Sequence, residues 1–364
     1  MGDVLVLTPL LILGGGAVLV YLAGRLVSTH NGFLASVTAA VYALALGAVA
    51  RLAPLARAGE QALWPAGVDA PAMLRAEPGA VLVGLTGLAL GLAVAVYSGR
   101  YLSDDQRHPA YYPLLLMLSF GALGLPLADD LFVLYLFAVI SGAASYVLVA
   151  FRRHTETAIE AGFKYVVMGS AAAVLALMGV GFLYRAEGTL SLARLGATPS
   201  GWKGLGIGLV CAGLAIKGAL VPAHTWLPDA HGRAPSSVSA ILSGILIETN
   251  IYAMVKVALL AGWGMEAFGA LLAVLAVANM TTGNLLALRQ VYGKRLLAYS
   301  SVAQVGYILL GLGLGLATSR PEPLVAALYL LVAHAGMKGL AFLAKGACHH
   351  YCQATLVRDL DGMY

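Results

Sequence analysis

The chain has 364 residues, of which 60% are hydrophobic and only 11% are charged, and its formal net charge is +5. Soluble domains carry about 25% charged residues, so this composition excludes a soluble globular protein and predicts a multi-pass membrane protein. A small positive charge is typical of the orientation signal in membrane proteins and does not indicate nucleic-acid binding.

Apolar runs fill most of the chain. A transmembrane helix needs about 20 consecutive apolar residues, and we find about eleven such runs. Runs of this length predict an all-α, polytopic membrane helix bundle and exclude a β-barrel, whose strands are shorter. The runs cover residues 4–24, 33–53, 79–98, 111–127, 129–151, 163–184, 204–222, 236–260, 266–288, 294–317 and 322–346.

The connections between the runs carry further information. The first run begins with MGD rather than with basic residues, so we expect a retained helix and not a signal peptide. Asp129 and Asp130 form a polar turn between the fourth and fifth runs. Residues 187–203 are too polar to span a membrane and predict an interfacial amphipathic segment with a loop. The distribution of Lys and Arg favours an external N-terminus and a cytoplasmic loop at 289–295.

The seventh run contains a lysine and then a proline, Lys217 and Pro222. A charge at the bilayer centre costs roughly 2.5–3.5 kcal/mol. Pro222 has no N–H for the carbonyl of Gly218, which predicts a kinked or broken helix. Transporters place ion sites at such breaks, so we predict that Lys217 lies beside a hydrated cavity and exchanges a proton. The alternative is that its side chain extends to a membrane interface.

The eighth run contains Glu248, followed by Asn250 and Lys256. A carboxyl group among apolar side chains prefers to be neutral unless a cation faces it. Lys217 on the preceding run is a candidate partner, and a proton shared between the two would be the unit of a relay. The spacing is equally compatible with a purely structural buried pair.

The eleventh run carries a polar stripe. His334 and Lys338 are four residues apart and therefore share a helix face, and Lys345 extends this stripe. Histidine is the side chain that titrates nearest neutral pH. A single membrane histidine is often a hydrogen-bonded core residue, but three titratable groups on one face predict a hydrated path.

Other motifs are weaker. The sequence CHHYC at 348–352 offers metal-ligand side chains, but a metal site normally needs a second ligand pair elsewhere, so we interpret it as an interfacial helix end and expect no metal and no cofactor. No phosphate-binding loop and no Ser-His-Asp order are present, so we expect no redox centre and no hydrolytic site. Tyr111, Tyr112 and Trp226 are typical of residues at a membrane interface.

Several of these stretches resemble the signatures of antiporter-like membrane subunits. This family includes subunits of respiratory complex I, Mrp-type cation/proton antiporters, and membrane-bound hydrogenase and formate hydrogenlyase complexes. The segment APSSVSAILSGILI is similar to the hydrogenase and Mrp-type branch. The similar stretches, which together cover roughly residues 80–363, are AGFKYVVMGS (161–170), KGALVPAHTWLPDAHGRAPSSVSAILSG (217–244), GKRLLAYSSVAQVGYILLG (293–311), HAGMKGLAFLAKG (334–346) and TLVRDLDGM (355–363).

The resemblance implies a fold of about fourteen helices with two inverted five-helix repeats, each containing a broken helix. It also implies a chain of buried Lys, Glu and His residues that carries protons. Lys217 matches the lysine of the broken helix, and His334 and Lys338 match a polar pair in the eleventh helix. The expected segments are N-terminal helices at 1–105, a first repeat at 106–262 with the break near 217–222, and an incomplete second repeat at 263–364.

Three positions depart from the family pattern. A glutamate is usual six residues before the serine of a Ser-Tyr pair, but Val139 occupies this position before Ser145 and Tyr146. The eighth-helix position that is often lysine is Glu248, so we infer that this carboxylate replaces the missing one. The chain stops at Tyr364, where the family continues into a second broken helix, so we expect either a fragment or an outer half-channel from another polypeptide.

These observations lead to three functional hypotheses. The first is a proton-translocating subunit that moves H+, with or without Na+ coupling, in a multi-subunit energy-converting complex of a bacterial or archaeal cell membrane. The second is a structural or adaptor subunit that does not pump, and the third is a proton-coupling subunit for inorganic-carbon uptake. The expected partners are further membrane subunits, a peripheral redox or zinc-containing module, and lipid. The predicted relay consists of Lys217, Glu248, His334 and Lys338, with Lys256 and Lys345 as secondary members and Pro222 as the helix-breaking residue.

Overall fold

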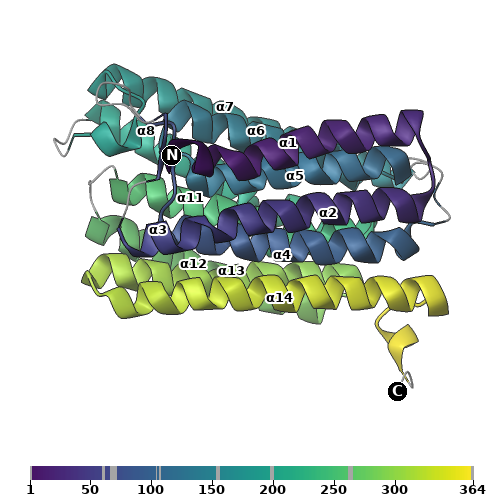
Figure 1. Ribbon diagram of the computed structural model, residues 1–364. Coiled ribbons are helices and arrows are strands. Elements are labelled where there is room, and N and C mark those ends of the chain that lie inside the picture. Colours follow the sequence, from purple (N-terminus) through teal and green to yellow (C-terminus); the bar gives the residue numbers. More distant parts are fainter. Residues whose placement is uncertain are drawn as a thin grey trace. The chain divides into compact units, whose positions relative to one another are not determined.

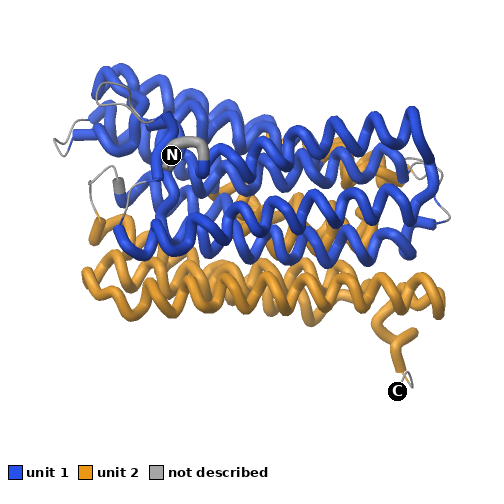
Figure 2. Tube along the Cα trace, viewed as in Figure 1, with its two compact units in different colours: residues 1–145, 170–214, 249–263 blue, residues 146–169, 215–248, 264–364 orange. Residues whose placement is uncertain are grey.

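The computed structural model describes residues 2–59, 62–65, 72–103, 105, 108–152, 156–196, 201–260 and 265–361 (Figure 1). These residues form two compact units, each described by itself below (Figure 2). Unit 1 comprises residues 1–145, 170–214 and 249–263, and unit 2 comprises residues 146–169, 215–248 and 264–364. The residues at the predicted segment boundaries 106, 262, 263 and 364 lie outside the described part of the chain, and that division stays a prediction.

The predicted all-α architecture is confirmed. Ten helices in the described residues are long and apolar enough to cross a membrane. The helices are α1 (Gly2–Leu26), α2 (Asn31–Ala50), α3 (Leu52–Arg57), α4 (Pro78–Tyr101), α5 (His108–Leu127), α6 (Leu131–Val149), α7 (Glu156–Glu187), α8 (Gly201–Lys217), α9 (Trp226–Arg233), α10 (Ser236–Ile241), α11 (Ile247–Leu260), α12 (Met265–Leu288), α13 (Gly293–Thr318) and α14 (Pro321–Cys352). Short 3-10 turns are η1 (Leu192–Arg194), η2 (Ala223–Thr225) and η4 (Arg358–Leu360), and η3 (Leu242–Leu246) is a π-helical segment.

The connections agree with the sequence in most places. Asp129 and Asp130 separate α5 from α6, as predicted. The polar segment 187–203 forms a loop with the single turn η1 before α8 begins, and its residues 197–200 lie outside the described part. The sequence analysis missed one feature, a two-residue antiparallel pair of β1 (Leu63–Trp64) and β2 (Leu74–Arg75).

In unit 1, α1 packs against α2 and α5, and α4 packs against the same two helices. Tyr111 and Tyr112 are fully buried in this packing, and their place at the membrane interface stays a prediction. The hydroxyl of Tyr112 donates to Oδ1 of Asn31 at 2.7 Å, and Asn31 Nδ2 donates to the carbonyl of Gly99 at 2.8 Å. Each buried tyrosine hydroxyl needs a polar partner, and interhelical hydrogen bonds supply it here.

In unit 2, α12, α13 and α14 pack in sequence, and α9 lies against α13. Small residues allow the first of these pairs to approach closely. A Cβ atom added at Gly283 of α12 would lie 2.5 Å from the backbone nitrogen of Ala303 in α13. Packing through small residues is the expected way to associate helices in lipid, where no hydrophobic drive operates between them. The same unit contains the helix break and most of the predicted relay residues.

Candidate functional site

The helix break of unit 2 begins directly after Lys217, the last residue of α8. Ala219 has a φ of 56°, in the left-handed region that ends helices. The amide of Leu220 donates back to the carbonyl of Ala215 at 3.0 Å, and Pro222 has no amide to continue the helix. The amide of Val221 donates to Oδ1 of Asn279 in α12 at 2.9 Å. The broken helix of the predicted fold is therefore present, and side chains satisfy the backbone groups that it frees.

Aromatic side chains hold this break in place. Trp226, the first residue of α9, donates its Nε1 proton to the carbonyl of Ile216 at 2.9 Å. Its ring stacks on Tyr165 with centroids 4.3 Å apart, and Tyr165 meets Tyr146 edge-on at 4.6 Å. Trp226 is only 3% exposed within the chain, and its interfacial position stays a prediction. Its indole joins the two sides of the break.

Lys217 is half-buried, and its Nζ donates to the hydroxyl of Tyr146 at 3.3 Å. Tyr146 can lie this close because α7 has a glycine at its contact point: a Cβ at Gly169 would collide with the tyrosine hydroxyl. The described partner of Lys217 is this phenol, and the described partner of Glu248 is the imidazole of His334. The pair of Lys217 with Glu248 stays a prediction.

Glu248 and His334 form a buried polar pair in this unit. The Oε1 of Glu248 lies 2.6 Å from Nδ1 of His334, and the side chains are 2% and 0% exposed. The π-helical segment η3 directly precedes the α11 turn that carries Glu248 and packs against α14, which carries His334. A π segment adds a residue to one helical turn and rotates the side chains of the next turn about the helix axis, and such segments are frequent at functional sites.

The remaining residues of the predicted stripe contact backbone carbonyls. Lys338 donates to the carbonyl of Leu297 in α13 at 3.2 Å. Lys345 donates to the carbonyl of Ala354, beyond the end of α14. The structure therefore brings His334 to a carboxylate but places the two lysines next to neutral oxygens.

Beyond α14, Asp359 closes the turn that follows Ala354. The backbone amides of Leu356 and Thr355 donate to its carboxylate and lower the pKa of Asp359 below the usual range. The Asp359 carboxylate thus accepts hydrogen bonds from the backbone amides of this turn. The turn follows Ala354, whose carbonyl is the partner of Lys345.

Lys256 belongs to unit 1 and has different surroundings. It is 5% exposed, and its Nζ donates to the carbonyl of Pro126 at 3.1 Å and lies 3.6 Å from Oε2 of Glu77. The sequence analysis assigned no partner to Lys256 and did not select Glu77.

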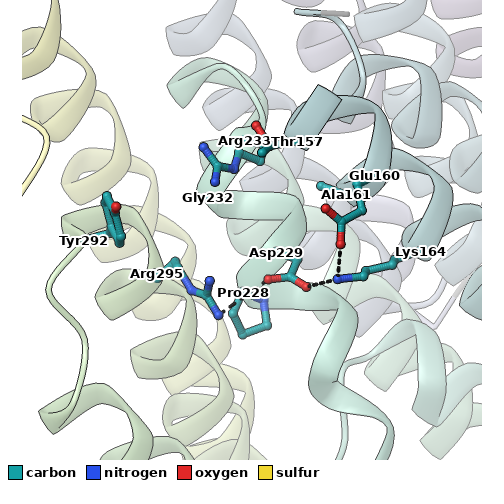
Figure 3. A pocket seen from close by; sticks show the side chains of 10 residues that line it. All are labelled: Thr157, Glu160, Ala161, Lys164, Pro228, Asp229, Gly232, Arg233, Tyr292 and Arg295. Carbon is teal, nitrogen blue, oxygen red and sulfur yellow. Dashed lines mark hydrogen bonds and ion pairs between the residues drawn. The ribbon is translucent and has the colours of Figure 1, made fainter. Parts of the chain in front are cut away.

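A pocket of about 210 Å³ lies beside the broken helix of unit 2 (Figure 3). Asp229 of α9 is at its centre and bridges two cations, Lys164 of α7 at 3.3 Å and Arg295 of α13 at 3.5 Å. Lys164 also contacts Glu160 at 2.8 Å. The lining residues are Thr157, Glu160, Ala161, Lys164, Pro228, Asp229, Gly232, Arg233, Tyr292 and Arg295. This is an opening with charged walls on α9, the helix that follows the break.

Within the described ranges, no group of three or more His, Cys, Asp or Glu side chains is arranged to hold a metal ion. That search includes the CHHYC segment, where Cys348 is half-buried and Cys352 is exposed.

Sequence reasoning missed the side chains that position the site. Tyr146 entered only as part of a Ser-Tyr pair, and the sequence assigned no partner to Asn279. Both act on the broken helix through contacts far apart in sequence. A polar residue on an otherwise apolar helix was the only available signal, and it does not specify a partner.

Comparison with known proteins places this geometry in context. The profile of a family described as "NADH:quinone oxidoreductase/Mrp antiporter, TM" matches residues 128–364. The chain is 35% identical over 371 residues to NADH-quinone oxidoreductase subunit N of Desulforudis audaxviator, covering 99% of this chain and 72% of that protein. It is 33% identical over 285 residues to F(420)H(2) dehydrogenase subunit N of Methanosarcina mazei, covering 75% of this chain and 56% of that protein.

Solved structures agree on the fold. A chain of the archaeal membrane-bound sulfane sulfur reductase superposes with a TM-score of 0.86 at 25% identity, covering 99% of this chain and 73% of that chain. A chain of the Mrp complex from Dietzia sp. superposes with a TM-score of 0.84 at 27% identity, covering 96% of this chain and 65% of that chain. The predicted hydrogenase and Mrp-type branch is not singled out, because the curated relatives above are both subunits N. The chain spans between about half and three quarters of the length of the relatives it matches.

Proposed function

We propose that this chain, which belongs to the NADH:quinone oxidoreductase/Mrp antiporter transmembrane family, translocates protons as one antiporter-like subunit of a larger membrane complex. It is a multi-pass membrane protein, and its relatives are subunits of multi-subunit membrane complexes in bacteria and archaea. Its own residues supply buried titratable groups on separate helices.

The buried hydrogen bond between Glu248 and His334 is the observation that carries this proposal. A carboxyl oxygen and an imidazole nitrogen 2.6 Å apart share one proton, which moves between them without leaving an unpaired charge in a dry interior. The second ring nitrogen of His334 is buried with no hydrogen-bond partner in the described part of the chain. Nε2 is thus the position at which a water or a further side chain would pass the proton on. Neutral histidine carries a donor and an acceptor on opposite edges of the ring, which suits this role.

Lys217 supplies a second proton-binding group at the helix break. Its described partner is a phenol oxygen, and a phenol accepts a hydrogen bond from an ammonium and donates one to a neutral amine. The amine therefore keeps this hydrogen bond in both protonation states, as a relay group requires. Lys338 donates to a carbonyl oxygen, which also stays neutral.

The pocket around Asp229 serves as water access to this unit. Its lining residues include the charged side chains Lys164, Asp229 and Arg295, and polar walls favour ordered water over an empty cavity. It opens on α9, one helix after the break. Protons from one aqueous phase reach the relay through this opening in our proposal.

The partner proteins are part of the same proposal. The names of the two curated relatives describe subunits of an NADH-quinone oxidoreductase and an F(420)H(2) dehydrogenase. We infer that this chain assembles with further antiporter-like membrane subunits and that a peripheral redox module drives them, with lipid filling the remaining contacts. A zinc-containing module for inorganic-carbon uptake is the alternative partner.

One position favours a second candidate, a structural subunit that has lost pumping. Val139 in α6 stands where the family resemblance places a glutamate, and valine can neither hold nor release a proton. In that case Lys217 and Glu248 are remnants that contribute only to packing.

Proton flux into proteoliposomes that contain the whole complex separates these functions. The variant Lys217→Ala lowers flux by about 10²-fold if this amine transfers protons, since positioned proton-transfer groups contribute about 10²–10⁴-fold. Flux should be measured with a pH-sensitive dye and with ²²Na+ in parallel, so that the coupling ion is identified. A complex that assembles with Lys217→Ala and retains its flux would show a structural subunit.

A further inference from the structure

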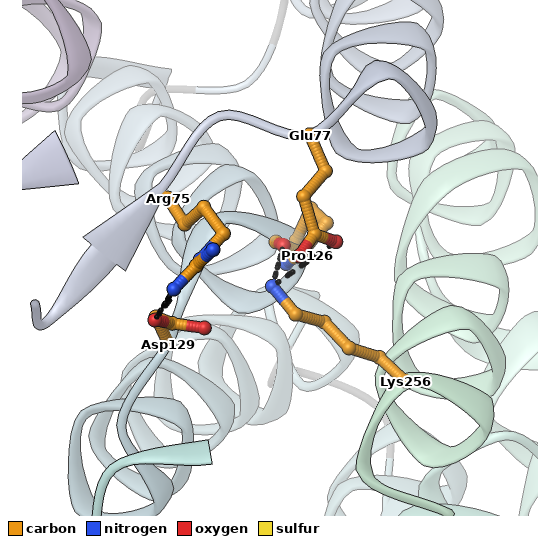
Figure 4. Close-up of polar contacts among 5 residues, drawn as sticks. All are labelled: Arg75, Glu77, Pro126, Asp129 and Lys256. Atoms are coloured by element: carbon orange, nitrogen blue, oxygen red, sulfur yellow. Dashed lines mark hydrogen bonds and ion pairs between the residues drawn. The ribbon is translucent and has the colours of Figure 1, made fainter. Parts of the chain in front are cut away.

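Unit 1 contains a cluster of four charged side chains, Arg75, Glu77, Asp129 and Lys256 (Figure 4). It consists of two ion pairs that differ in whether the cation can lose its proton. In the first, Arg75 donates from Nε and Nη2 to Oδ2 of Asp129 at 3.1 and 2.9 Å. In the second, Nζ of Lys256 lies 3.6 Å from Oε2 of Glu77. The cluster is neutral when all four groups are ionised.

The pair of Arg75 with Asp129 is a fixed support. Arginine keeps its proton throughout the accessible pH range, so this pair cannot pass a proton on. Asp129 is 1% exposed, and its amide donates to the carbonyl of Met73 at 2.8 Å. Leu74 forms a bridge with Ala128 next to it. These contacts hold the segment before α4 against the turn between α5 and α6, which keeps Glu77 at its place beside Lys256.

The pair of Lys256 with Glu77 has the opposite properties. The lysine side chain is 4% exposed, whereas the glutamate side chain is 32% exposed. One partner is thus enclosed by protein and the other reaches water. Lysine, unlike arginine, can lose its proton in a buried site. Tyr252, one helical turn before Lys256, lines the same place, because a Cβ at Gly79 would lie 2.7 Å from its hydroxyl oxygen.

We propose that Glu77 exchanges the proton of Lys256 with the aqueous phase at this end of unit 1. The inference rests on the proposed function and on the prediction from the sequence that Lys256 is a secondary member of the relay. It adds a residue on the α4 side that the sequence did not indicate and gives the relay a connection to water separate from the pocket around Asp229.

The proton moves in two balanced steps. An N–H bond of the Lys256 ammonium breaks and an O–H bond forms on Oε2 of Glu77, which leaves a neutral amine beside a neutral carboxylic acid. Glu77 then gives this proton to water, and Lys256 takes the next proton from inside. Both charges disappear together, so neither ion is left buried and unpaired. The 3.6 Å separation is bridged by one water or by a small movement of the exposed carboxylate.

Unit 1 also provides a matched control. Nζ of Lys203, which is fully buried, lies 3.5 Å from Oε1 of Glu187 and donates to the carbonyl of Gly196. Both pairs consist of a buried lysine and a glutamate, and in both the lysine also donates to a backbone carbonyl. The pair of Lys203 with Glu187 joins the last residue of α7 to the first turn of α8.

The experiment compares Glu77→Gln with Glu187→Gln in the assembled complex in proteoliposomes. We expect at least about a tenfold loss of proton flux for Glu77→Gln, the lower range for a lost proton-transfer group, and a change within about twofold for Glu187→Gln. Formate or azide added to the Glu77→Gln complex should restore part of the flux, because a small acid can carry the proton between Lys256 and water. A structural role would show no such rescue.

Two further results decide the outcome. Glu77→Asp keeps a carboxylate and should retain more flux than Glu77→Gln. This variant also tests the inference if the complex with Glu77→Gln assembles poorly. Normal flux in assembled Glu77→Gln, or equal loss in Glu77→Gln and Glu187→Gln without rescue, overturns this inference. If Lys217→Ala abolishes flux while Glu77→Gln does not change it, only the role of Glu77 fails, whereas normal flux in Lys217→Ala removes the proposed function itself.

Discussion

The two units stabilise their buried lysines in different ways. In unit 1, Lys256 and Lys203 lie 3.6 and 3.5 Å from the carboxylates of Glu77 and Glu187. In unit 2, Lys217 and Lys338 donate to neutral oxygens of a phenol and a backbone carbonyl. A carboxylate favours the charged ammonium, whereas a neutral oxygen favours it much less.

This difference indicates which groups change charge easily. A lysine in unit 1 loses its proton most easily to the neighbouring carboxylate, because both charges then disappear together. A lysine beside a phenol or a carbonyl leaves no carboxylate charge behind when it loses its proton. Lys164 of unit 2 also pairs with carboxylates, but it is not a buried lysine. Its side chain lies at the pocket and is 50% exposed, so it does not belong to this comparison. The contrast leads to three predictions beyond those for Lys217 and Glu77.

The largest effect is expected at the carboxylate of unit 2. Glu248→Gln removes the group that shares a proton with His334 and should lower proton flux by about 10²-fold, about as severely as Lys217→Ala. The measurement is dye-detected flux in proteoliposomes with the assembled complex.

Glu322→Gln is the matched control for this change, because Glu322 is an exposed carboxylate in the first turn of α14. Its flux should stay at the parental level. Parental flux in Glu248→Gln itself would mean that the bond to His334 is structural and that the contrast between the units has no functional meaning.

A smaller effect is expected at the phenol beside Lys217. Tyr146→Phe removes the hydroxyl that accepts from Nζ at 3.3 Å but keeps the ring contacts with Tyr165. One hydrogen bond contributes about 1 kcal/mol, which corresponds to a flux reduced by about fivefold. The optimum of the pH–flux profile should shift as well, since the amine loses a neutral partner. An unchanged profile would show that Tyr146 does not act on Lys217.

The smallest effect on transport is expected at Glu187. Glu187→Gln leaves buried Lys203 with the carbonyl of Gly196 as a described partner, so we expect a loss of stability of about 1–3 kcal/mol and flux within about twofold of the parent. The thermal midpoint of the purified complex in detergent reports the first quantity. A strong loss of flux without loss of stability would remove the distinction between Glu187 and Glu77.

Much of the fold followed from the order of residues. The apolar runs predicted about eleven spans, and ten helices in the described residues are long and apolar enough to cross a membrane. The seventh run falls short because α8 ends at Lys217, and Pro222 after Lys217 predicted this break. The four-residue spacing of His334 and Lys338 placed them on one face of α14. These features depend on hydrophobicity, helical period and the missing amide of proline, which are local properties.

The partners of the site did not follow from the sequence. The sequence offered Lys217 as a candidate partner of Glu248 and did not indicate His334, which the packing of η3 and α14 brings to this carboxylate. The hydrogen bond of Val221 with Asn279 and the ion pair of Lys256 with Glu77 join segments that are far apart in the sequence.

The amino-acid sequence by itself therefore determined that the chain forms membrane helices, where one of them breaks and which polar residues lie among apolar ones. Only the tertiary structure decided which of those residues meet. Burial makes each polar group need a partner, but side-chain direction and helix packing choose that partner, and neither is encoded in a local pattern.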